Sequence, residues 1–461
     1  MNTAESFRDR SSLVKEDGKR KWIYAVQPSG RYYNYRTFLT IFYLVILVGL
    51  PFLEWNGNPL FLLDIPHRKI ILFGIVFTPQ DFFLLMLSAV SFIVSIVLFT
   101  VVFGRIFCGW VCPQTIFMEM IFRRIEYWIE GSAEAQKRLN QKKWDTEKYF
   151  KKILKHTIFW IFSFLIANIF LSYIIGIKQL TKIITEPITE HLVGFILILV
   201  FTTIFYAVFA FLREMACVVV CPYGRLQSVL LDKNSIVVAY DYVRGEPRSK
   251  NKKNTDTPKG DCIDCGLCVR VCPTGIDIRN GTQMECVNCT ACIDACDGIM
   301  DKIKKPRGLI KYASQNSLEG KQKSLITPRV IFYSIFLFLL VTLTSYLMFS
   351  KSDLDVLIMR SQGQLFQEQP NGKISNLYTL KIQNKLNQSR ILNFEIEGKN
   401  AEIQWVNGKI DTLNAEQETS KVLFVLLNKN EISQAKNQIY LLVKENNKVI
   451  KKIKTQFFGP F

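Results

Sequence analysis

The chain has 461 residues, of which 49% are hydrophobic, and it carries a formal net charge of +19. This combination fits neither an ordinary soluble enzyme nor a disordered tail. A membrane protein fits both values, because apolar spans raise the hydrophobic fraction while basic residues gather in the loops on one side of the bilayer. Nucleic-acid binding is disfavoured, because the basic residues form neither an aromatic-interleaved patch nor a recognition fold.

Five apolar runs approach the length of about 20 residues that spans a bilayer. They cover residues 38–53, 82–103, 153–177, 192–212 and 330–349. For any one run, the competing interpretation is a helix buried in a protein core. Together the runs predict a multi-span α-helical membrane protein, with four transmembrane helices before residue 213 and a fifth over residues 330–349.

Lysine and arginine are unevenly distributed between these runs. Residues 1–37, 105–152 and 213–329 are rich in both, whereas residues 54–81 and 178–191 carry few. Cytoplasmic loops of membrane proteins carry the excess of basic residues. We therefore expect the three basic segments to lie in the cytoplasm and the carboxyl terminus, which follows an odd number of spans, to lie outside it.

Two motifs with the pattern C-x-x-x-C-P follow the second and fourth runs: "CGWVCPQTIF" from Cys108 and "CVVVCPYGRL" from Cys217. Residues at i and i+4 lie on one face of a helix, so Cys108 would pair with Cys112, and Cys217 with Cys221. The proline after each pair disfavours helical geometry at the second cysteine. We therefore expect each helix to break near the membrane surface and interpret the two stretches as an internal repeat.

Charged residues accompany these thiol pairs, with Arg105 before the first pair and Arg213 before the second. Glu119, Glu126 and Glu214 are expected to be solvated or paired with nearby arginines. Three uses of the thiols remain open: they bind or reduce a soft metal ion such as copper, since thiolates select Cu(I); they cycle between dithiol and disulfide; or they pack as small apolar side chains. The duplicated spacing argues against packing alone.

The basic segment 213–329 contains the densest group of cysteines, "CIDCGLCVRVCP" from Cys262 and "CVNCTACIDAC" from Cys286. In each C-x-x-C-x-x-C-x-x-x-C pattern, three thiolates on a tight loop hold three irons of a cubane, and the fourth cysteine ligates the other cluster. The pattern predicts a bacterial-type 2[4Fe-4S] ferredoxin domain over about residues 253–305. Cluster 1 would be held by Cys262, Cys265, Cys268 and Cys296, and cluster 2 by Cys286, Cys289, Cys292 and Cys272.

Zinc and disulfides fit these eight cysteines less well. Structural zinc sites use two C-x-x-C knuckles with a longer spacer and have no use for four cysteines within eleven residues. Disulfides are disfavoured on the reducing side of the membrane. Gly266, Thr290 and Ala291 leave room for a cluster against the backbone. Pro273 ends the first loop, whereas Asp297 stands where the second loop lacks the matching proline.

The tail over residues 351–461 contains no cysteine and no histidine. It consists of short β segments, "NLYTLKIQNK", "RILNFEIEG", "AEIQWVNG", "KVLFVLLNK" and "QIYLLVKEN", separated by Asn, Gly and Lys. Strands at a spacing of about ten residues indicate a β-sandwich. Without soft ligands the tail is a poor metal site, so we expect it to dock a partner outside the membrane, with a purely structural cap as the alternative.

The order of basic amino terminus, spans, "FCGWVCP", "CVVVCPYGRLQ", eight-cysteine loop, last span and β-rich tail resembles the FixG/CcoG family, the cytochrome c oxidase accessory proteins of bacteria. The resemblance covers nearly the whole chain. It implies a polyferredoxin of the bacterial inner (cytoplasmic) membrane, with a cytoplasmic ferredoxin domain and a periplasmic immunoglobulin-like domain. It also carries the family's cluster ligands onto the eight loop cysteines, and its membrane thiols onto Cys108, Cys112, Cys217 and Cys221.

The resemblance further implies a role in assembly of the C-type haem-copper oxidase, in which the family is thought to reduce Cu(II) to Cu(I) for copper insertion. We therefore expect an electron-transfer oxidoreductase with two low-potential [4Fe-4S] clusters that acts as a cupric reductase, with oxidase-assembly or copper-delivery proteins as partners. A quinol-linked membrane ferredoxin of the NapH type and a non-enzymatic copper chaperone or scaffold are the alternatives. The electron donor and a homo-oligomeric state stay open.

Overall fold

The computed structural model of the chain describes residues 13–14, 17, 19–55, 57–66, 68–78, 81–248, 260–321, 326–350, 354–361, 363, 365–385, 388–397, 401–406, 408–410, 412–415, 417–432 and 434–460. Part of the predicted basic amino-terminal segment, the first residues of the predicted ferredoxin domain (253–259) and both ends of the predicted tail domain (351–353 and 461) lie outside the described residues. The chain divides into two compact units. The first combines residues 1–53, 59–73 and 77–344, and the second combines residues 54–58, 74–76 and 345–461.

Among the described residues, five helical segments are long and apolar enough to cross a membrane. They are α1 (Arg31–Gly49) with the 3₁₀ turn η1 (Leu50–Phe52), α2 (Phe82–Phe103), α7 (Thr146–Ile175), α9 (Leu192–Ala207) with the π-helical η4 (Val208–Leu212), and α15 (Pro328–Phe349). Helix α7 begins seven residues before the apolar run, because Asp145 caps it by accepting a hydrogen bond from the Lys148 amide at 3.0 Å. Charged residues of high helix propensity then form its first turns.

Shorter elements connect these helices. Between α1 and α2 lie the strands β1 (Glu54–Trp55), β2 (Asn58–Pro59), β3 (Phe61–Asp64), β4 (Lys69–Leu72) and β5 (Ile75–Phe77). Between α2 and α9 lie the helices α3 (Ile106–Trp110), α4 (Pro113–Ile116), η3 (Phe117–Phe122), α5 (Arg123–Glu130), α6 (Ala133–Gln141) and α8 (Ile177–Thr185). After η4 follow η5 (Ala216–Val220), α10 (Pro222–Leu230), β6 (Val237–Tyr240), α11 (Tyr242–Gly245), α12 (Leu267–Arg270), η6 (Ile278–Asn280), α13 (Ala291–Lys302), β7 (Ile310–Ala313) and α14 (Gln315–Leu318).

Both C-x-x-x-C-P motifs break the helix at their second cysteine, as the sequence predicts. Cys112 has a ψ of 123° and Cys221 a ψ of 111°, both far from the helical value. The following prolines, Pro113 and Pro222, occupy the first position of α4 and α10. A proline is favoured at this position, where its missing N–H costs no hydrogen bond and its fixed φ suits the helix.

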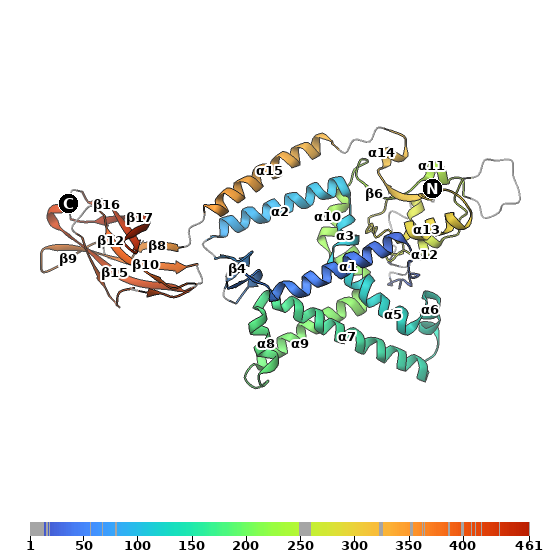
Figure 1. Cartoon of the computed structure of the whole chain (residues 1–461), viewed down its shortest axis with the longest axis horizontal. Helices are drawn as coiled ribbons and strands as arrows, with labels where there is room; N and C mark the ends of the chain where they lie inside the picture. Colours follow the sequence, from blue (N-terminus) through green and yellow to red (C-terminus); the bar gives the residue numbers. More distant parts are fainter. Residues whose placement is uncertain are drawn as a thin grey trace. The chain divides into compact units, whose positions relative to one another are not determined.

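Aromatic side chains hold together the helices that follow the first motif. Phe117 and Phe122 of η3 pack with Phe159 of α7 and Phe209 of η4 in one buried apolar group. The rings of Phe122 and Phe209 stack with centroids 4.4 Å apart. In Figure 1, α7 and α9 accordingly lie side by side.

The predicted ferredoxin region contains α12 and α13 and is flanked in sequence by β6 and β7, which form an antiparallel pair. The amino-terminal end of α1 lies beside α13 (Figure 1). There, Tyr32 and Tyr33 donate their backbone N–H groups to the carboxylate of Asp294 at 3.0 and 2.7 Å. An anion at a helix amino terminus is favourable, so this contact joins the first apolar helix to the cysteine-rich region.

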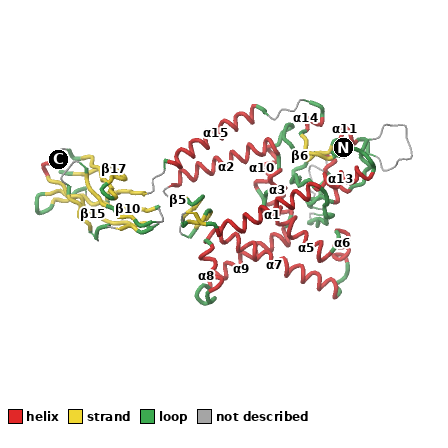
Figure 2. The backbone as a smooth tube through the Cα atoms, in the orientation of Figure 1, coloured by secondary structure: helices red, strands yellow, loops and turns green. Residues whose placement is uncertain are grey.

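The second unit contains a sandwich of two main antiparallel sheets, seen as the strand-rich part of Figure 2. One sheet has the order β13 (Glu402–Trp405), β15 (Glu418–Asn428), β10 (Lys373–Asn384) and β8 (Leu354–Arg360), with β9 (Gln367–Glu368) also paired to β10. The other has the order β12 (Asn393–Ile396), β16 (Lys436–Glu445) and β17 (Lys448–Phe458), and a small pair joins β11 (Arg390–Ile391) to β14 (Thr412–Leu413).

Alternating apolar side chains fill the space between these sheets. Leu423, Val425 and Leu427 of β15 are all 0% exposed, and the same alternation occurs on β10 and β16. The predicted β segments fall on strands, but β8 and β17, like the short β9 and β14, have no counterpart among them. In β17, lysines occupy much of the outward face, a composition that protects an edge strand from aggregation and weakens its apolar signal.

Candidate functional site

The two halves of the predicted ferredoxin domain have the same backbone geometry. Asp264 and Asn288 both have a positive φ, at 50° and 54°. Two residues later, Gly266 and Thr290 both have a φ of 65°, and α12 and α13 begin directly after them. Left-handed geometry is unusual for a β-branched residue. Because Thr290 is 1% exposed, its surroundings hold the strained turn in place.

Two cavities lie between the eight loop cysteines. The first encloses about 370 Å³, open solvent included, and its lining contains Cys262, Cys265, Cys268 and Cys296. The second encloses about 340 Å³, and its lining contains Cys272, Cys286, Cys289 and Cys292, together with Cys268. A [4Fe-4S] cubane takes four thiolate ligands, so each cavity offers the donor set that such a cluster needs. Each cavity thus contains one of the two sets of four that the motif spacing predicts, the second with Cys268 in addition, and ligation itself stays a prediction.

Burial makes most of these thiols reluctant to ionise on their own. It raises the pKa of Cys268, Cys286 and Cys296 to about 12. It also raises the pKa of Cys289 to about 11 and that of Cys292 well above its usual value. Thiolates at these positions therefore need a cation to stabilise them, and iron binding would release their protons.

The lining of the first cavity is mainly apolar. Met300 and Leu309 belong to it, and both are 1% exposed. Arg279 also belongs to the lining, but its guanidinium is paired with Asp277 at 2.6 Å and with Asp264. The charge of Arg279 is thus offset by carboxylates.

The second cavity has more polar surroundings. Thr274 and Thr290 belong to its lining. Next to it, Arg36 of α1 donates from Nε to the carbonyl oxygen of Gly109 at 3.0 Å and from Nη1 to that of Cys289 at 3.1 Å. Sequence reasoning did not single out Arg36, because it is one of several arginines in a basic segment and belongs to no motif.

The first C-x-x-x-C-P pair lies against the loop of the second cavity. Cys108 is 8% exposed and belongs to one buried apolar group with Val287, Cys289 and Ala291. The close approach requires a glycine, because a Cβ on Gly109 would lie 2.5 Å from the carbonyl oxygen of Val287. The fold therefore brings a predicted copper-binding thiol beside a predicted iron–sulfur ligand.

The two thiol pairs meet through reciprocal contacts. The Cys108 thiol donates to Oε1 of Gln227, on the helix after the second pair, at 2.9 Å. The hydroxyl of Thr115, on the helix after the first pair, lies 3.9 Å from the Sγ of Cys217. Gln227 is 0% exposed, and no sequence motif marked it as part of the site.

All four membrane-proximal cysteines act on one another electrostatically. The pKa of Cys108 is raised to about 11, chiefly by burial; Arg105 opposes the shift, while Cys112 and Cys221 add to it. Burial likewise raises the pKa of Cys217 to about 12, with further contributions from Cys112, Cys108 and Cys221. Burial therefore keeps the thiols of Cys108 and Cys217 protonated unless a cation is bound.

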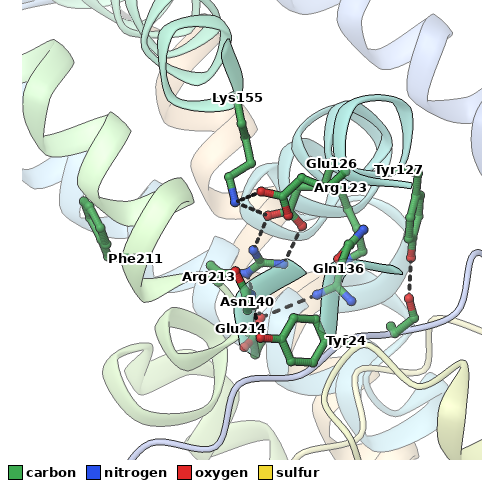
Figure 3. A network of polar contacts seen from close by, with 12 residues as sticks. Tyr24, Arg123, Glu126, Tyr127, Gln136, Asn140, Lys155, Phe211, Arg213 and Glu214 are labelled. Atoms are coloured by element: carbon green, nitrogen blue, oxygen red, sulfur yellow. Dashed lines mark hydrogen bonds and ion pairs between the residues drawn. The ribbon is translucent and has the colours of Figure 1, made fainter. Parts of the chain in front are cut away.

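A buried ionic network includes Arg213, which precedes the second thiol pair in the sequence (Figure 3). Arg213 donates to the two carboxylate oxygens of Glu126 at 2.5 and 2.9 Å. Arg123 is paired with Glu119 at 3.2 Å and with Glu214 at 3.5 Å. The expected pairing of these glutamates with arginines is confirmed, and it leaves both guanidinium groups offset by carboxylates.

Comparison with known families matches three parts of the chain. Residues 212–315 match a family described as "4Fe-4S dicluster domain", and residues 85–132 match a "4Fe-4S binding domain". Residues 344–460 match an "IG-like fold at C-terminal of FixG". Together with five helices that could span a membrane in the described part of the chain, these matches define a membrane-associated iron–sulfur electron-transfer protein with an immunoglobulin-like domain.

Two relatives that match most of the chain identify the family within this class of protein. Protein RdxA of Cereibacter sphaeroides is 34% identical over 392 residues, which are 82% of each chain. The nitrogen fixation protein FixG of Rhizobium meliloti is 29% identical over 504 residues, covering 96% of this chain and 93% of that one. A solved FixG-related protein from Vibrio parahaemolyticus matches 24% of this chain at 20% identity, with a TM-score of 0.21. The chain belongs to the FixG-like family, and the resemblance noted in the sequence is confirmed.

Proposed function

We propose that this protein is a cupric reductase of the bacterial inner membrane that serves the assembly of a C-type haem-copper oxidase. One observation carries the proposal: Cys108, a thiol suited to copper, shares a buried apolar group with Cys289, a predicted iron–sulfur ligand. Single-electron transfer is fastest between redox centres that lie close together, and this buried group brings a ligand of each centre into one cluster.

Two [4Fe-4S] clusters would occupy the two cavities. Their ligands would be Cys262, Cys265, Cys268 and Cys296 in the first, and Cys272, Cys286, Cys289 and Cys292 in the second. When bound, the clusters supply one-electron carriage. The chain contributes the thiols, the buried setting and the close approach at Gly109.

Copper would be the substrate at Cys108, Cys112, Cys217 and Cys221. Thiolates favour Cu(I) over Cu(II), so binding at these residues raises the potential of the copper couple. Each Cu(II) takes up one electron and leaves as Cu(I), and the electron comes ultimately from a one-electron reductant outside the chain. Because the thiols of Cys108 and Cys217 have raised pKa values, copper binding releases protons.

The proposal includes sidedness. The ferredoxin domain lies in the cytoplasm and the immunoglobulin-like domain in the periplasm, where it docks an oxidase-assembly or copper-delivery protein. The distribution of basic residues supports this arrangement. A reporter fused after residue 461 should be active only outside the cytoplasm, and one inserted near Lys253 only inside. Equal activity at both positions would refute the orientation.

A double substitution tests the copper step. Cys108→Ser with Cys217→Ser should abolish Cu(I) binding and the oxidation of dithionite-reduced protein by Cu(II), while the iron content and the EPR signal on reduction stay unchanged. Cys265→Ser is the matched control: it should lose or convert one cluster while copper binding remains. Full copper binding and reduction in the double variant would overturn the proposal.

A second candidate follows from the family match at residues 85–132, which covers Cys108 and Cys112 and is described as 4Fe-4S binding. In this alternative the four membrane-proximal thiols hold iron–sulfur chemistry instead of copper. Iron and sulfide analysis of anaerobically purified protein separates the two. Two clusters give about eight irons per chain, and a third gives about twelve.

A further inference from the structure

Arg36 is a buried cation for which the described residues provide no carboxylate. Its side chain is 4% exposed, and its two hydrogen bonds go to carbonyl oxygens, those of Gly109 and Cys289. Its Nη2 atom is buried without a hydrogen-bond partner among the described residues. A buried charge without a counter-charge is strongly unfavourable, so this position calls for an anion.

Arg105 is likewise buried next to this loop, with no carboxylate partner among the described residues. It is 3% exposed and donates to the carbonyl oxygen of Met284, two residues before Cys286. Its Nε atom is buried and has no hydrogen-bond partner in the described part of the chain. Arg36 and Arg105 thus approach the cysteine loop of the second cavity from α1 and from the start of α3, respectively.

The other two buried arginines of the described chain, and the half-buried Arg279, are paired with carboxylates. Arg123 and Arg213 are each paired with glutamates (Figure 3). Arg279, in the lining of the first cavity, is paired with Asp277 and Asp264. Positive charge left without carboxylates is therefore found beside the second cavity, and the charge beside the first is offset.

We infer that Arg36 and Arg105 are the counter-charges of the cluster held by Cys272, Cys286, Cys289 and Cys292, and that they set its reduction potential above that of the other cluster. The inference rests on the proposed ligand sets. A cubane with four thiolates is anionic and gains a further negative charge on reduction, so nearby cations stabilise its reduced form more than its oxidised form. At equilibrium an added electron then resides on the second cluster, beside Cys108.

Arg36 is also a positioning residue. Its two donors hold the carbonyl groups of Gly109 and Cys289 at one guanidinium, which fixes the first thiol pair against the second loop. The same side chain therefore directs the electron and shortens its path to the thiols, in keeping with a flow from the first cluster to the second and then to copper.

Potentiometric titration of the full-length protein, followed by EPR, tests this inference. Arg36→Gln should shift the midpoint of one cluster to lower potential and leave the other unchanged, and Arg105→Gln should shift the same one. Arg36→Lys keeps the charge but not the two-carbonyl geometry, so the midpoint should stay near that of the unmodified protein. A merely structural role predicts instead that Lys and Gln behave alike.

Matched variants identify the signals. Cys265→Ser removes or converts the first cluster, so the signal that remains belongs to the second. Arg279→Gln should leave that second midpoint unchanged. If the Arg36→Gln protein loses iron, the midpoint potentials of Arg105→Gln and Arg36→Lys test the inference in its place. Unchanged midpoints in Arg105→Gln, or in Arg36→Gln with full iron, would overturn the inference but not the proposed function. An unmodified protein with far fewer than about eight irons would instead contradict the ligand sets themselves.

Discussion

The two C-x-x-x-C-P repeats make the same turn in different surroundings. In both, the residue four positions before the first cysteine has a left-handed φ, 59° at Gly104 and 53° at Arg213. The first repeat packs through Gly109 against the loop of the second cavity. The second has Val218 at the matching position, and this side chain packs near Ile23 of the amino-terminal segment. A duplicated motif thus sets the local backbone, while the neighbouring elements give each copy its own contacts.

The arginines that precede the two thiol pairs, Arg105 and Arg213, also differ in their contacts. Arg213 is held by the carboxylate of Glu126, whereas the polar contacts described for the Arg105 side chain are with a carbonyl oxygen and a thiol. The comparison indicates that the second repeat anchors the helices to one another, and that the first repeat presents positive charge to the redox centres. Exchanging these features between the copies tests that division of roles.

The largest effect on stability is expected from removing the carboxylate of Glu126, the main partner of Arg213. Glu126→Gln would leave Arg213 with Glu214, whose contact is 3.5 Å, and would weaken a fully buried ion pair. We expect a loss of about 3 kcal/mol in the free energy of unfolding, measured by denaturation in detergent. Glu147→Gln is the control, because its exposed pairs are worth about 1 kcal/mol at most. Equal losses in the two variants would contradict the prediction.

The same carboxylate gives the stability a dependence on pH. Burial opposes ionisation of Glu126, but Arg213 prevails and lowers the pKa below its ordinary value of 4.5. A carboxyl group whose pKa is depressed in the folded state contributes its full stabilisation above that ordinary value and loses it as the pH falls through the folded-state value. Acidification below about pH 4.5 should therefore destabilise the protein, and Glu126→Gln should lack this part of the pH dependence.

An intermediate effect is expected from giving the first repeat the side chain of the second. In Gly109→Val, the new Cβ would lie 2.5 Å from Val287 O and 2.9 Å from backbone atoms of Asn288. Because backbone must move, we expect a loss of about 2 kcal/mol of unfolding free energy. The reciprocal change, Val218→Gly, should cost about 1 kcal/mol through backbone entropy. An unaltered melting temperature in Gly109→Val would show that the close packing is not needed.

The smallest effects are expected at the reciprocal contacts between the repeats. Gln227→Leu removes the acceptor 2.9 Å from the Cys108 thiol and should cost about 1 kcal/mol. Thr115→Val removes a contact of 3.9 Å to Cys217 and should cost less. Alkylation rates of the two cysteines provide a second measurement, since the Cys108 thiol should react faster only in Gln227→Leu. The reverse order of effects would contradict the assignment of the stronger contact.

The sequence by itself determined the local features of this protein. Apolar runs located the long helices, prolines located the breaks at Cys112 and Cys221, and alternating residues located most strands of the tail. The cysteine spacing also predicted which four thiols would hold each cluster, because a C-x-x-C-x-x-C loop admits few backbone paths around a cubane. These properties are local because each depends on residues within a few positions along the chain or on a repeated spacing.

Only the tertiary structure decided which of these parts meet. The contact of Cys108 with the loop of Cys289, the reach of Arg36 between them and the acceptor role of Gln227 all join residues more than 70 positions apart. Periodicity does not encode such contacts, because they depend on how the helices pack against the cysteine-rich region. The sequence likewise shows an arginine before each thiol pair. Only the packing of the helices determines that Glu126 neutralises Arg213, whereas Arg105 has no carboxylate partner among the described residues.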